Sequence, residues 1–136
     1  MTEAGEGSRV LRSVGAVVGG ALIGIVLSLA TDALLHAVKV LPPTGTPAGS
    51  PVLGLATLYR TVYGVLGAYA TARWAPSRPM LHVTVLGTLG LLASLAGAVA
   101  TWNQEAVYGP HWYPLALVVL ALPTAWLGGW LGSKGR

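Results

Sequence analysis

The sequence predicts an all-α protein, a transmembrane four-helix bundle of up-down-up-down topology with both termini in the cytoplasm. Of its 136 residues, 54% are hydrophobic and only 9% are charged, whereas an average soluble domain is about a quarter charged. The apolar residues form four long blocks, as in membrane spans. The net charge of +4 comes from basic residues at the ends of these blocks. That placement indicates membrane orientation and not a nucleic-acid surface.

The first block, from Ser13 to Leu35, carries no charged residue before Asp32. As a helix it is about 33 Å long, enough to cross a hydrocarbon core of about 30 Å. We expect residues 1–12 to be a poorly ordered cytoplasmic tail. A cleaved signal peptide is the alternative, since Ser28-Leu29-Ala30 resembles a cleavage site. However, the block is longer and richer in glycine than a usual signal peptide.

Three further spans complete one integral membrane domain over residues 1–136, and prolines separate them. The proline-rich segment 38–51 cannot continue a helix, and Pro76 and Pro79 form a tight turn. Pro123 should kink the last span, with Gly128 and Gly129 loosening its final turns. The four predicted spans are 13–35, 52–75, 80–102 and 112–132.

The orientation follows from the distribution of Lys and Arg in the short flanks. The first loop carries only Lys39, and the connection after the third span carries no Lys or Arg. Short connections also predict that consecutive helices are antiparallel neighbours. Six cations lie on the predicted cytoplasmic side: Arg9, Arg12, Arg73, Arg78, Lys134 and Arg136.

Ionisable residues within the spans predict one polar site near the outer end of the first two helices. Asp32 and His36 lie one turn apart, and Arg60 lies about 12 Å into the second span from outside. Helical side chains lean toward the helix N-terminus. Asp32 and Arg60 therefore approach each other and should form an ion pair. His36 can hydrogen-bond to Asp32, and Tyr59 and Tyr63 can offer hydroxyl groups or a cation–π face to Arg60.

Two interpretations of this site remain open. The ion pair can simply fasten two helices, or the residues can form a ligand, ion or proton site. His82 and His111 do not predict a metal or haem site, because the three histidines lie on different segments without ligand spacing. Cysteine is absent. We therefore predict no metal and no cofactor.

Small residues recur on several spans and predict close helix packing. The pattern is clearest on the first span, where small residues repeat every four positions before Asp32. Packing within the bundle and contact between copies of the chain are both compatible with it. The predicted packing residues are Gly20, Gly24, Ser28, Gly64, Gly67, Gly87, Gly90 and Gly97.

Residues 67–76, which read GAYATARWAP, and the following Arg78-Pro79-Met80-x-His82 carry a family resemblance. The segment resembles one found in uncharacterised small bacterial membrane proteins with four spans, although Ala68 stands where a second glycine is usual. The resemblance implies a bacterial inner-membrane protein and no activity. Small multidrug resistance transporters are similar in size. They carry a mid-membrane Glu in the first span, and here no Glu lies in any span.

We expect a small polytopic membrane protein that is not an enzyme, because only Asp32 with His36 offers a paired acid and base. The first interpretation is a non-catalytic subunit or accessory protein. Its partners would be the lipid bilayer, another membrane protein or further copies of itself. The alternative is a small transporter or channel with an outward-facing site at Asp32, His36 and Arg60. The inner halves of the spans contain few polar residues, which argues against a transporter or channel.

Overall fold

The structure is a computed structural model that describes residues 3–40, 49–104 and 110–134. The described residues form four helices and are otherwise turns and loops. Three of the helices are long and apolar enough to cross a membrane. The chain is therefore a multi-pass membrane protein. The helices are α1 (Glu3–Ala37), α2 (Ser50–Trp74), α3 (Pro79–Thr101) and α5 (Trp112–Ser133).

The remaining helix, α2, is the least apolar of the four and lies between α1 and α5. Polar side chains are tolerated there because neighbouring helices cover them. Thr71, for example, is fully buried. A small core of Ala68, Ala72, Val83 and Ala125 joins α2, α3 and α5.

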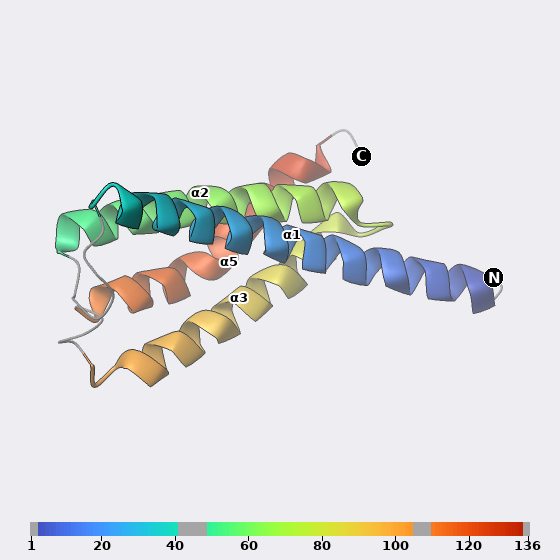
Figure 1. Cartoon of the computed structure of the whole chain (residues 1–136). Coiled ribbons are helices and arrows are strands. Elements are labelled where there is room, and N and C mark those ends of the chain that lie inside the picture. The colour runs from blue at the N-terminus through green and yellow to red at the C-terminus, as the bar shows by residue number, and fades with distance from the viewer. Residues whose placement is uncertain (1–2, 41–48, 105–109, 135–136) are drawn as a thin grey trace.

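Helix α1 begins at Glu3, so most of the segment predicted as a disordered tail is helical. Residues 3–12 contain no proline, and Ala, Glu, Leu and Arg, which favour helix, outnumber Gly5 and Gly7, which disfavour it. Nothing in this segment therefore ends the helix. With 35 residues, α1 is about 52 Å long. Its first turns extend past the other helices (Figure 1).

Contacts between side chains fix the relative directions of the helices. Antiparallel α1 and α2 meet at Ala16 and Thr71 near one end and at Asp32 and Arg60 near the other. Helix α5 runs parallel to α2 and antiparallel to α3. Although a tight turn joins α3 to α2, α3 packs mainly against α5. Helix α5 also packs extensively against α2, and sequence order alone does not predict this contact, because it does not say which non-consecutive helices touch.

Prolines define helix starts, as expected from sequence. Pro51 lies in the first turn of α2 and Pro79 begins α3, where a missing N–H costs no hydrogen bond. Arg78, just before α3, has a positive φ of 45°. The turn thereby reverses the chain within a few residues.

Candidate functional site

The site is built on the crossing of α1 and α2, where the two backbones touch. A Cβ atom on either Gly20 or Gly67 would collide with the carbonyl oxygen of the other. Beside this crossing, the Thr71 hydroxyl donates a 2.8 Å hydrogen bond to the Ala16 carbonyl. Only residues without a side chain permit this approach. The crossing therefore fixes where α1 lies on α2.

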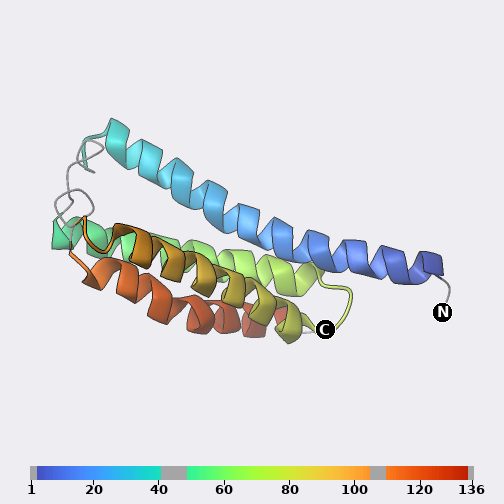
Figure 2. The same ribbon diagram turned by 90° about the horizontal axis from the view of Figure 1, so that it is seen from below.

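Toward its C-terminal end, α1 diverges from the other three helices (Figure 2). Longer side chains bridge the widening gap. The Asp32 carboxylate accepts hydrogen bonds from the Tyr59 hydroxyl on one oxygen and from Arg60 Nη2 on the other. One turn away on α2, the Tyr63 hydroxyl is 2.7 Å from Thr31 Oγ1. The structure thus brings Asp32 together with Arg60 and Tyr59, and places Tyr63 on a neighbouring contact.

The ion pair is partly shielded from its surroundings. The Arg60 side chain is 31% exposed and that of Asp32 is 22% exposed, while Tyr59 is buried. The Tyr59 ring centroid lies 5.8 Å from Arg60 Cζ, within range of a cation–π contact. Tyr113, from the start of α5, also interacts with Arg60. Nothing in the sequence around Tyr113 connects it to the site, because its partner lies on a different helix.

His36 lies apart from the ion pair, contrary to expectation. It is exposed, and no hydrogen bond joins it to Asp32. Both carboxylate oxygens of Asp32 face α2 and are already bound there. One helical turn further along, α1 has moved away from α2 (Figure 2).

The other two histidines hold connections between segments. His82 Nδ1 lies 2.9 Å from the Arg78 carbonyl, and its Nε2 lies 2.9 Å from the Ser13 hydroxyl. His111 stacks on Trp102 with ring centroids 3.6 Å apart. These contacts tie α1 to the start of α3 and join the end of α3 to the start of α5.

The glycines divide into those that pack and those that do not. A Cβ on Gly64 would lie 2.8 Å from the Thr124 methyl group, and one on Gly87 would lie 2.8 Å from the Ala125 Cβ. Ser28 is buried, and Gly24 has room for a Cβ at 3.6 Å from the Tyr63 carbonyl.

Two predicted packing residues behave differently. Gly90 and Gly97 are exposed, and a Cβ on either would meet no atom of the chain within 4 Å. Gly90 faces the space that α1 leaves as it diverges from α3, whereas Gly97 faces a separate space between α3 and the start of α5. Conversely, sequence reasoning missed the close packing at Gly128, Gly129 and Gly132. Added Cβ atoms there would collide with the Val65 carbonyl, the Val83 side chain and the Tyr69 carbonyl.

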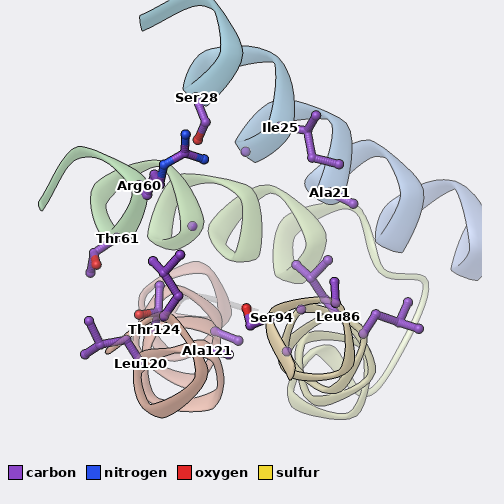
Figure 3. A pocket seen from close by; sticks show the side chains of 18 of the residues that line it. Ala21, Ile25, Ser28, Arg60, Thr61, Leu86, Ser94, Leu120, Ala121 and Thr124 are labelled. Carbon is purple, nitrogen blue, oxygen red and sulfur yellow. The ribbon is translucent and has the colours of Figure 1, made fainter. Parts of the chain in front are cut away.

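Divergence of α1 leaves a cavity of about 560 Å³ between the four helices. Arg60, Ser28 and Thr61 lie toward one end of it, and Ala21 and Leu86 lie toward the other (Figure 3). A smaller cavity of about 360 Å³ lies between α3 and α5 and shares Ala93, Ser94 and Leu117 with the larger one. The larger cavity is apolar except for Arg60 and a few hydroxyl groups.

Protein-family models, curated proteins and solved structures give no match to the chain. The roles of these residues therefore rest on their geometry. In that geometry, one carboxylate oxygen of Asp32 accepts from a cation and the other from a phenol, so both are already engaged between the two helices. The arrangement is well suited to joining two helices.

Proposed function

We propose that the protein is a non-catalytic subunit or accessory protein of a membrane complex or of a homo-oligomer. One observation carries the proposal: Asp32 and Arg60, the charged groups inside the first two spans, bind each other and Tyr59. Their hydrogen-bonding groups hold α1 against α2. Charged residues within a membrane are costly unless they are paired, and here their pairing has a structural role.

We also propose that the helices cross a bacterial cytoplasmic membrane up-down-up-down, with both termini inside. The ends of α1 and α5 that carry Arg9, Arg12 and Lys134 lie beside the turn that carries Arg73 and Arg78 (Figure 1). A cluster of cations at one end supports a cytoplasmic location for that end. The resemblance of segment 67–82 to bacterial four-span proteins supports the choice of membrane.

The surface of α3 supports a role in assembly. Within α3, only Val83, Gly87 and Ala98 are buried. The remainder, including Leu92 and Val99, is half-buried or exposed. Because α3 has its main support from one helix, a large apolar face is available to lipid or to a partner span.

Capture of the tagged protein from its native membrane in mild detergent tests the proposal. We expect a stoichiometric protein partner, or an oligomer of the chain that survives dilution. The Asp32→Asn/Arg60→Gln variant should bind less partner because α1 is no longer fastened, and Ser133→Ala, at the opposite end of the bundle, serves as control. A chain that remains monomeric without any partner over a wide concentration range would refute the proposal.

A small transporter is the second candidate, and the cavity that begins at Arg60 favours it. Transport of a polar solute needs a hydrated path, whereas the inner part of the cavity offers mainly glycine, alanine and leucine. The chain lacks cysteine, so an Ala121→Cys variant carries a single thiol on the cavity wall. Rapid reaction of this thiol with a charged, membrane-impermeant reagent would favour transport. Protection of the thiol would favour the non-catalytic role.

A further inference from the structure

The cavity between α1 and α3 has walls made of small or apolar residues. Gly24 on α1, Gly90 and Ala93 on α3, and Ala121 on α5 all line it. Because these residues are small, the bundle does not fill the space by itself. The volume of about 560 Å³ lies within the range of about 300–1,000 Å³ that is usual for ligand sites.

The opening of the cavity lies between two helices that are apolar enough to span a membrane. Figure 2 shows α1 leaning away from α3 on this side. Leu29 on α1 and Leu89 on α3 line the cavity and are 60% and 53% exposed. In a bilayer, such an opening faces hydrocarbon chains and not water. An apolar void of this kind is poorly suited to water, which needs polar partners.

One end of the cavity is polar. Figure 3 shows the Arg60 guanidinium and the Ser28 hydroxyl pointing toward one another there. A guanidinium has five N–H donors. Asp32 accepts from Nη2, Tyr113 interacts with the same side chain, and Nε is buried without a hydrogen-bond partner among the described residues. The Arg60 side chain remains 31% exposed and lines the cavity, so the guanidinium N–H groups that neither Asp32 nor Tyr113 covers are available to an acceptor that enters from the cavity.

The charge of Arg60 is already balanced by Asp32, so the acceptor needs no net charge. In the orientation proposed above, α2 enters the membrane from outside. The Arg60 side chain therefore leans toward the outer lipid headgroups. A ligand with an uncharged oxygen joined to a long apolar chain fits the cavity, because the oxygen can lie at the Arg60 end and the chain along the apolar walls. The ester carbonyl of a membrane lipid has this chemistry.

We propose that the cavity is a lipid site, which holds one acyl chain between α1 and α3 while the ester carbonyl accepts a hydrogen bond from Arg60. The site does not depend on a protein partner. A chain proved to be monomeric would still bind lipid here. A complex with an empty cavity would refute this proposal and leave the subunit role intact.

Photolabelling of the full chain in phosphatidylcholine vesicles tests the site. The probe is a phosphatidylcholine with a diazirine at the end of one acyl chain, and labelled residues are mapped by mass spectrometry. We expect labels on Ala121 and Leu86 inside the cavity as well as on Val119, which is 71% exposed. Labelling of Val119 alone would overturn the proposal.

Filling the cavity supplies the matched comparison. Gly90→Leu places a side chain into the open space, while Gly54→Leu makes the same change at an exposed glycine away from the cavity. We expect Gly90→Leu to lower labelling of Ala121 at least about fivefold, with Val119 unchanged, and Gly54→Leu to have no effect. Equal labelling of Ala121 in the two variants would overturn the site.

The ester carbonyl is tested with an ether-linked probe of the same chain length, which lacks the carbonyl. A hydrogen bond to a charged group predicts that the ester probe labels the wall about tenfold more strongly. Equal labelling by both probes would overturn the assignment of Arg60. In the same vesicles, a disulfide-linked dimer of Gly90→Cys with an unlabelled wall would show that a second copy fills the space and would overturn the lipid site.

Discussion

The pairing of Asp32 with Arg60 predicts a coupling energy that a double-mutant cycle can measure. The side chains are 22% and 31% exposed. The contribution of this pair to stability should therefore lie between two limits. An exposed ion pair contributes about 0–1 kcal/mol, and removal of one partner from a buried ion pair costs about 3–5 kcal/mol. We expect Asp32→Asn and Arg60→Gln each to cost about 2 kcal/mol of unfolding free energy. With a coupling of about 1.5 kcal/mol, the double variant should lose about 2.5 kcal/mol instead of about 4.

Unfolding in mixed micelles with increasing dodecyl sulfate, followed by far-UV circular dichroism, gives the four free energies. The control cycle combines Asp32→Asn with Ser133→Ala, whose hydroxyl donates to the Gly129 carbonyl at the other end of the bundle. These two changes share no partner and should be additive within about 0.5 kcal/mol. If Asp32→Asn and Arg60→Gln are equally additive, the ion pair does not fasten α1 to α2.

Two further predictions concern the packing of α1 on α2, and a third concerns the membrane orientation. Tyr59→Phe removes a hydrogen bond to the Asp32 carboxylate and should lower the free energy of unfolding by about 1.5 kcal/mol. Tyr63→Phe removes a hydrogen bond between two uncharged hydroxyl groups and should lower it by only about 0.5–1 kcal/mol. A larger loss for Tyr63→Phe than for Tyr59→Phe in unfolding experiments would contradict these contacts. Gly67→Ala adds a Cβ against the Gly20 carbonyl and should lower the free energy of unfolding by about 1–3 kcal/mol. Gly54→Ala adds a Cβ in open space and should raise it by about 0.5–1 kcal/mol. Equal melting temperatures of the two variants would argue against backbone contact at the crossing. In intact cells, a membrane-impermeant thiol reagent should label Lys39→Cys but not Ser77→Cys, and the opposite pattern would invert the proposed orientation.

The helices were predictable because each is a long apolar block bounded by proline or charge. The ends of the predicted spans 52–75, 80–102 and 112–132 lie within two residues of the observed helix ends. The start of α1 was not predictable from hydropathy, because residues 3–12 are polar yet compatible with helix. Hydropathy reports burial in lipid, whereas helix continuity depends on the absence of a breaker.

The candidate site was predictable where the argument used direction and depth along two consecutive helices. That argument brings Asp32 to Arg60, and the structure contains this contact. It does not determine how far α1 leans from its neighbours, which leaves His36 exposed and Gly90 facing a cavity. Contacts between non-consecutive helices, such as that of Tyr113 with Arg60, depend on how the bundle packs and have no local signal.

Native mass spectrometry of the protein released directly from its membrane tests the proposed role in a complex most directly. A single chain has a mass of 13.9 kDa. The account predicts either an oligomer whose mass is a multiple of this value or a complex with a second membrane protein. In the Asp32→Asn/Arg60→Gln variant, the additional chain should be lost. A lone 13.9 kDa chain that carries nothing but lipid, in wild type and variant alike, would contradict it.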